Sequence, residues 1–213
     1  MKLSTETISV LKNFSTINAN LMVKAGSSLS TMSAMKNIVA KADVAEEFLS
    51  DFAIYDLNEF LSALSLFGKP DLEFNNDFVI ITEEGTSKSL KYWFSDPSVV
   101  TTPSKEISMP STELTFNLSS DTLNEITKAA AVIGVPDMSL SGTGLGAKLV
   151  VTDKKNSTAN AYETSVDLGD VAANHGAEFK FWFKVENLKL IPGTYDVEVS
   201  SKKISHFTNT KLG

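Results

Sequence analysis

The sequence predicts an α+β fold of two similar domains, each built from antiparallel sheets with helices gathered on one face. Three observations support this prediction: strand-like runs far outnumber amphipathic helices, one helix start recurs in the second half, and a proline-rich segment separates the halves. The chain has 213 residues, 42% of them apolar and thirteen of them phenylalanine, which is enough for a core in each half.

The first predicted helix covers residues 4–18. Ser4 or Thr5 provides the N-cap, and Glu6 lies in the first turn, where the helix dipole favours an anion. Residues at helical spacing give this helix an apolar face and an opposite polar face with a single lysine. The apolar face consists of Ile8, Leu11, Phe14 and Ile17, and the polar face of Ser9, Lys12, Asn13 and Thr16.

Short strands and a second helix account for the rest of the first half. A helix is predicted over 57–66 because apolar residues recur at helical spacing until Gly68 and Pro70 stop it. The predicted strands are residues 21–24, 28–33, 36–43, 52–55, 71–74, 78–82 and 87–94.

A proline-rich segment at 97–112 is predicted to connect a first domain, 1–96, to a second, 113–213. Its three prolines lie among serines and threonines, which is typical of an extended, semi-rigid linker. Its apolar residues are Val99, Val100, Ile107 and Met109.

The second half repeats the first at an offset of 115 residues. Residues 3–8 match 118–123, and Leu11 matches Ile126, so a second capped helix is predicted at 119–133. Strands at 147–152 and 179–183, a short helical segment at 186–190, and strands at 194–200 and 203–208 follow in this half. The counterpart of 87–94 is missing. Two explanations stay open: the chain is truncated, or the second domain lacks an edge strand.

The composition excludes several kinds of chemistry. There is no cysteine, and all 19 cationic residues are lysine, so disulfides, thiolate metal sites, arginine fingers and bidentate arginine–guanine contacts are impossible. His175 and His206 lack any ligand spacing. The scattered carboxylates have no partner histidine and are expected in solvated loops: Asp43, Glu46, Glu47, Glu83 and Glu84. We expect no catalytic residue, no metal site and no cofactor. The glycine-rich run 142–146 lacks the phosphate-loop spacing and is better explained as a hairpin turn.

Apolar runs are too short for a membrane span, and no apolar signal-peptide region follows the N-terminus. A net charge of -7 is unlike that of a protein that grips nucleic acid tightly. These features predict a soluble, acidic, intracellular protein without a membrane partner.

Four segments resemble the sliding clamps of T-even-type bacteriophages: 8–18, 52–66, 91–93 and 188–195. The resemblance runs along nearly the whole chain, is specific in the first two segments and is loose between about 137 and 177. It implies a processivity factor of the phage DNA polymerase in the cytoplasm of the infected bacterium. The family forms a homotrimeric ring of six similar domains, with helices lining the hole and sheets outside, loaded onto double-stranded DNA by an ATP-driven clamp loader.

The resemblance also implies roles for particular residues. The side chains expected to face DNA are Lys2, Lys12, Asn13, Lys128 and Lys189. Those expected to line a pocket for peptides of the polymerase and other partners are Val99, Val100, Ile107, Met109 and Tyr92. The alternative for the first set is an ordinary solubilising surface, and for the second set the pinning of the connector to the sheets.

Two other functions remain open from the sequence. A structural virion protein, such as a tail or head-decoration component, would also be acidic, cysteine-free and rich in strands. Matched amphipathic helices at 4–18 and 119–133 argue against a β-sandwich decoration protein. A hydrolase with an Asp/Glu pair is disfavoured because no motif supports it.

Overall fold

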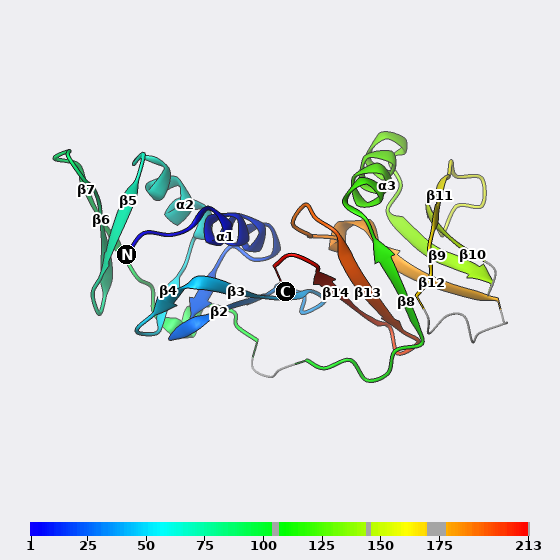
Figure 1. The fold of residues 1–213 in the computed structure, drawn as a ribbon, viewed down its shortest axis with the longest axis horizontal. Coiled ribbons are helices and arrows are strands. Elements are labelled where there is room, and N and C mark those ends of the chain that lie inside the picture. The colour runs from blue at the N-terminus through cyan, green and yellow to red at the C-terminus, as the bar shows by residue number, and fades with distance from the viewer. Residues whose placement is uncertain (104–106, 144–145, 170–177, 213) are drawn as a thin grey trace. The chain divides into compact units, whose positions relative to one another are not determined.

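The computed structural model describes residues 1–103, 107–143, 146–169 and 178–212, and it divides the chain into two compact units (Figure 1). The units are Met1–Glu106 and Ile107–Gly213. Their boundary falls inside the proline-rich segment 97–112. Each unit is described by itself below.

The first unit contains two α-helices, the 3-10 helix Pro97–Val99 and seven strands among its described residues. Its strands form three small antiparallel sheets, with the orders β1-β4, β2-β3 and β5-β6-β7. Each helix and strand expected from the sequence is present, and β3 continues five residues beyond its expected end at residue 43. The elements are α1 (Thr5–Ile17), β1 (Leu21–Val23), β2 (Gly26–Met32), β3 (Val39–Phe48), β4 (Phe52–Ile54), α2 (Leu57–Ser65), β5 (Pro70–Phe74), β6 (Phe78–Glu83) and β7 (Ser89–Trp93).

Helices α1 and α2 pack against each other, and α1 also packs on β2 and β3 (Figure 1). Each helix buries one face: α1 buries Thr7, Val10, Leu11 and Phe14, and α2 buries Leu57, Phe60, Ala63 and Leu64. Since burial of one large apolar side chain contributes about 1.5–3 kcal/mol, these faces fix the helices to the sheets. The opposite face of α1 is thereby left to solvent.

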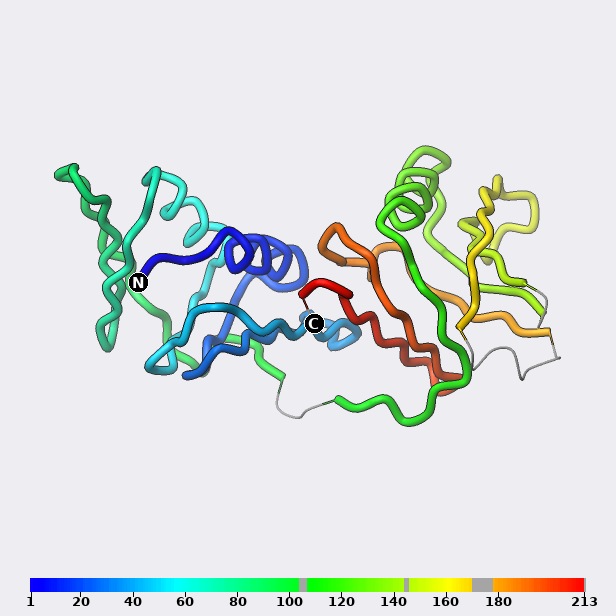
Figure 2. Tube along the Cα trace, viewed as in Figure 1, coloured from blue at the N-terminus to red at the C-terminus, as the bar shows by residue number. Residues whose placement is uncertain are grey.

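The second unit has one α-helix and seven strands among its described residues. The strands form two antiparallel sheets with the orders β11-β10-β9-β12 and β14-β13-β8, whose paths are easiest to follow in Figure 2. Helix α3 packs on β10 and β11. The elements are β8 (Leu114–Leu118), α3 (Ser120–Ile133), β9 (Asp137–Thr143), β10 (Gly146–Thr152), β11 (Tyr162–Val166), β12 (Phe179–Lys184), β13 (Tyr195–Ser200) and β14 (Ile204–Asn209).

The glycine-rich run forms a hairpin between β9 and β10, as predicted. The strands pair antiparallel with Thr143 opposite Gly146, and residues 144–145 of the run lie outside the described part. A Cβ atom on Gly142 would come within 2.2 Å of the Gly146 carbonyl oxygen. Glycine is therefore required at 142 by close backbone contact, which is a structural role and not phosphate binding.

The helical segment predicted at 186–190 is wrong. The structure has a single 3-10 turn, Val185–Asn187, and Lys189 lies beyond it. Its N-cap residue, Lys184, makes no side-chain capping bond, whereas Asp56 caps α2 by accepting from the backbone N–H groups of Asn58 and Glu59. An uncapped segment that ends at Pro192 is too short to offset the cost of starting an α-helix.

The two units repeat one plan. Ser4 Oγ accepts a hydrogen bond from Thr7 N at 3.1 Å, and Ser119 Oγ accepts one from Thr122 N at the same distance, 115 residues later. Leu11 is buried in α1, as is Ile126 in α3. No strand follows β14 in the described part of the chain, so a counterpart of β7 is not found there.

Glu113, just before β8, ties the chain to the turn between β13 and β14. Its Oε1 accepts hydrogen bonds from the hydroxyls of Ser111 and Ser201, each at 2.9 Å, and its Oε2 accepts from Ser201 N at 2.7 Å. The bonds from Ser201, followed by that from Ser111, lower the pKa of Glu113 to about 2. The carboxylate therefore holds this turn only while it is ionised.

We expect the second unit to lose stability in acid partly through Glu113. The pKa of Glu113 is lower in the folded state than its ordinary value of 4.5. The stabilisation by Glu113 is therefore fully present above pH 4.5 and disappears as the pH falls towards 2. In a Trp93→Phe background, Glu113→Gln should flatten this part of the pH dependence of stability, measured by urea unfolding with Trp182 fluorescence. The exposed Glu186→Gln is the matched control, and an unchanged acid dependence in Glu113→Gln would contradict the assignment.

Candidate functional site

The solvent-facing sides of α1 and α3 carry the lysines that the sequence singled out. Lys12 is exposed near the middle of α1 and Lys128 near the middle of α3. Neither lysine forms an ion pair within the described residues. Their exposed neighbours are mostly small or uncharged: Thr5, Ser9 and Thr16 on α1, and Asn124, Ala131 and Val132 on α3.

Hydroxyl groups on these helices bond to their own backbone. Ser15 Oγ donates to the Lys12 carbonyl at 2.9 Å, Thr16 Oγ1 to the Asn13 carbonyl at 2.7 Å, and Thr127 Oγ1 to the Leu123 carbonyl at 2.7 Å. Such bonds satisfy the hydroxyls internally. The lysine ammonium groups are therefore the donors that extend furthest into solvent, which explains how a helix face can be polar yet sparsely charged.

The acidic residues of α1 and α3 lie towards their N-terminal ends. Glu6 and Asp121 occupy the first turns, where the helix dipole stabilises them. Glu125 accepts a hydrogen bond from the Tyr162 hydroxyl of β11, and this bond raises the pKa of Tyr162. Each helix thus carries its lysine near the middle of its exposed face, and the electrostatic potential of that face is weak.

Glu46 of β3 anchors the start of α1, and its burial in a strand corrects the expectation of a solvated loop. Its carboxylate accepts hydrogen bonds from Ser4 N and Thr7 Oγ1, and its side chain is only 8% exposed. Burial disfavours the charged form, but the bonds from Thr7 and Ser4 outweigh it and hold the pKa of Glu46 below its ordinary value. The helix that carries Lys12 is therefore fixed to the sheet by a buried carboxylate.

The other residues expected to face DNA are in different settings. Lys2 lies 3.8 Å from Glu84, and its side chain is 56% exposed. Asn13 is half-buried on α1, while Lys189 is exposed but lies outside any helix. Only Lys12 and Lys128 are thus lysines placed on exposed α-helical faces.

The expected pocket residues are divided between the two units. Val99 and Val100 belong to the first unit, and Ile107 and Met109 to the second. Val99 is 53% exposed and Ile107 is 57% exposed. Neither of the hollows described below is lined by these residues.

Tyr92, which was expected at a pocket for partner peptides, packs on α2. Its ring lies edge-on to Phe60, with centroids 5.2 Å apart, and its hydroxyl donates to the Asp56 carbonyl at 3.2 Å. Burial, with smaller contributions from Glu59 and Asp56, raises its pKa to about 12. The aromatic alternation along β7 therefore directs this ring towards the core.

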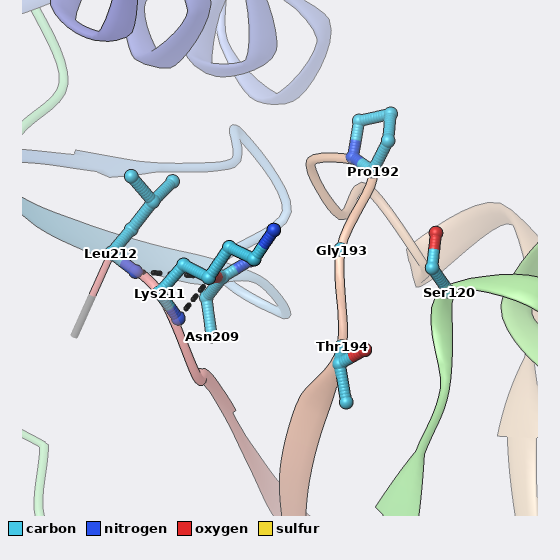
Figure 3. Close-up of a pocket in the computed structure, with 7 residues that line it drawn as sticks. All are labelled: Ser120, Pro192, Gly193, Thr194, Asn209, Lys211 and Leu212. Carbon is cyan, nitrogen blue, oxygen red and sulfur yellow. Dashed lines mark hydrogen bonds between the residues drawn. The ribbon is translucent and has the colours of Figure 1, made fainter.

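Two hollows lie in the second unit. One, of about 300 Å³, is lined by Ser120, Pro192, Gly193, Thr194, Asn209, Lys211 and Leu212 (Figure 3). Asn209 Oδ1 accepts hydrogen bonds from Lys211 N at 2.9 Å and Leu212 N at 3.1 Å. The other hollow surrounds Trp182. Neither contains a residue that the sequence had marked as a site.

No group of histidine, aspartate and glutamate residues in the described ranges is arranged to hold a metal ion. His206 Nδ1 lies 3.3 Å from Glu198 Oε2, and His175 falls outside the described residues. None of the described helices is long and apolar enough to cross a bilayer.

The fold has a close counterpart among solved structures. Proliferating cellular nuclear antigen from Entamoeba histolytica superimposes with a TM-score of 0.64 over 91% of this chain and 85% of that one, at 16% identity. The architecture of duplicated units, with helices packed against antiparallel sheets, is therefore the clamp fold.

Sequence comparison narrows this class. Residues 4–102 match the family model of the DNA polymerase processivity factor. The sliding clamp of Vibrio phage KVP40 is 35% identical over 218 residues, covering 100% of this chain and 96% of that protein. The sliding clamp of Enterobacteria phage T4 is 29% identical over 206 residues, with 95% and 88% covered. The chain belongs to the family of bacteriophage sliding clamps, the DNA polymerase processivity factors. This confirms the resemblance found in the sequence and gives no support to a virion protein.

Proposed function

We propose that this protein is a non-enzymatic clamp that encircles duplex DNA as a homotrimer and tethers the replicative polymerase in the infected cell. The observation that carries the proposal is the pair of matched helices, α1 and α3, each with an exposed face on which a lysine forms no ion pair with a described residue. Family membership and the clamp fold support the same function. No cofactor or metal is required.

The exposed faces of α1 and α3 favour weak contacts with DNA. Lysine is a hydrated point charge that attracts phosphate without reading bases, so Lys12 and Lys128 allow the protein to move along any sequence. Each such contact releases counterions from the DNA, so the affinity falls as the salt concentration rises. A net charge of -7 is compatible with this mode of binding, because the ring holds DNA by encircling it. Negative charge elsewhere on the surface discourages DNA from binding to the outside of the ring.

The polymerase and an ATP-driven clamp loader are the proposed protein partners. The proposed docking points for partner peptides are exposed apolar side chains of the proline-rich segment, above all Val99 and Ile107. Val100 and Met109, which are half-buried, complete the proposed set.

Size and topology test the proposed function. Light scattering should give a mass three times the 23.0 kDa of one chain, because a ring of six domains needs three chains. Protein loaded on nicked circular DNA should stay bound, and cutting the circle should release it. A stable monomer at micromolar concentration would contradict a constitutive trimer, and equal retention on circular and linear DNA would contradict encirclement.

A further inference from the structure

Strand β12 has one face in the core and one face outside it. Phe179, Phe181 and Phe183 pack against the core of the second unit. Because side chains alternate along a strand, Lys180, Trp182 and Lys184 lie on the opposite face. Helix α3 packs into the same core as the phenylalanines, so the Trp182 face is the side of the sheet away from α3.

Lysines surround Trp182 on this face. Lys154 Nζ lies 5.0 Å from the Trp182 ring centroid, and Lys180 Nζ lies 4.8 Å from it. A hollow of about 390 Å³ is lined by Asp137, Lys154, Lys155, Trp182, Phe183 and Lys184. We call Lys154, Lys155, Lys180, Trp182 and Lys184 the Trp182 groove.

The groove has an excess of positive charge. Asp137 is its buried carboxylate, and both of its oxygens are engaged, Oδ1 by Lys184 Nζ at 2.6 Å and Oδ2 by Lys154 N at 3.0 Å. Asp153 and Glu186 add negative charge nearby, and both act on Lys184. Lys154, Lys155 and Lys180 form no ion pair in the described part of the chain. Lys154 and Lys180 thus lie over the Trp182 ring, and Lys155 lines the same hollow.

We propose that the Trp182 groove binds an extended acidic peptide of a partner protein, with carboxylates on Lys154, Lys155 and Lys180 and an apolar side chain against Trp182. Charge complementarity selects the carboxylates, and the half-buried indole supplies an apolar surface for the neighbouring residue. This partner surface differs from the proposed DNA-facing helices and from the proline-rich segment.

The strand edge favours a peptide over nucleic acid. β12 is the terminal strand of the sheet β11-β10-β9-β12, and the described residues place no further strand beside it. An extended peptide can bond to such an edge through its backbone and place alternate side chains over the groove. A nucleic acid would instead need a basic track along its backbone, which Asp137, Asp153 and Glu186 interrupt here.

The two tryptophans of the chain make a direct test possible. In a Trp93→Phe protein, Trp182 is the only tryptophan, and its emission reports the groove. The probe is a short synthetic peptide in which aspartate alternates with leucine. We expect a saturable change in Trp182 emission that weakens as salt is raised. Adding Lys154→Glu and Lys180→Glu should weaken binding by about tenfold, since two favourable charge contacts become repulsive.

Matched controls separate specific binding from general attraction. Lys202→Glu with Lys203→Glu makes the same charge change at the exposed turn after β13 and should leave the affinity unchanged. The inference is overturned by an absence of saturable binding, by equal weakening in both double variants, or by equal binding of a peptide with lysine in place of aspartate. Tighter binding of oligothymidylate than of the acidic peptide also overturns it. Unchanged circular dichroism verifies that the variants fold.

Discussion

Replacing both Lys12 and Lys128 with glutamate is expected to shorten processive DNA synthesis on the order of tenfold at moderate salt while the fold stays intact. Both side chains are exposed on helix faces and neither forms an ion pair in the described residues, so no native contact is lost. Each reversal turns an attraction for phosphate into a repulsion. Each phosphate contact that disappears should also lower the salt slope of DNA binding by about one.

The measurement is product length on a primed circular template with the cognate polymerase and loader, over a range of salt. The control is Lys36→Glu with Lys202→Glu, which makes the same charge change at one exposed turn in each unit. If the control shortens the products equally, net charge and not helix position is responsible. Full processivity in the Lys12 and Lys128 variant would contradict both assignments.

Glu46→Ala is expected to destabilise the first unit by about 2 kcal/mol. The substitution leaves Ser4 N and Thr7 Oγ1 without their acceptor at a site where the carboxylate is only 8% exposed. It also removes a negative charge from the N-terminus of α1. Because the folded-state pKa is lowered, this stabilisation is present above the unfolded-state pKa of Glu46 and disappears as the pH falls below it.

Urea unfolding of a Trp182→Phe background, followed by Trp93 fluorescence, reports the first unit alone. This is needed because a chain of two compact units need not unfold in one step. The exposed neighbour Glu47→Ala serves as the control. The anchoring role of Glu46 fails if the two alanine variants unfold at the same urea concentration.

Local signals predicted α1 and α3 well. Their serine caps, first-turn acids and apolar spacing are all local in sequence, and the structure uses Ser4 and Ser119 as the caps. β8 was missed because Leu118 had been assigned to the helix start, although Leu114, Phe116 and Leu118 alternate inward. β9 and β11 were missed because serine, threonine and glutamate residues interrupt their apolar pattern.

The site residues that the sequence did not predict depend on distant contacts. Glu46 reaches Ser4 across 42 positions in the chain, and no local pattern encodes that approach. The Trp182 groove needs Lys154, which follows β10, to meet Trp182 on β12, and β9 separates these strands in the sheet. The packing of Tyr92 is a related case: alternation along β7 shows that one face is inward, but not which face α2 covers.

Some hydroxyl groups of α1 and α3 donate hydrogen bonds to the backbone of their own helix, and this affects how easily duplex DNA would slide along these helices. A serine or threonine whose proton is held by its own helix cannot donate that proton to a passing phosphate. What remains is the broad attraction of flexible ammonium groups, which changes little as one phosphate replaces the next. Movement along DNA would then meet a nearly level energy profile, because phosphate contacts do not depend on the base sequence.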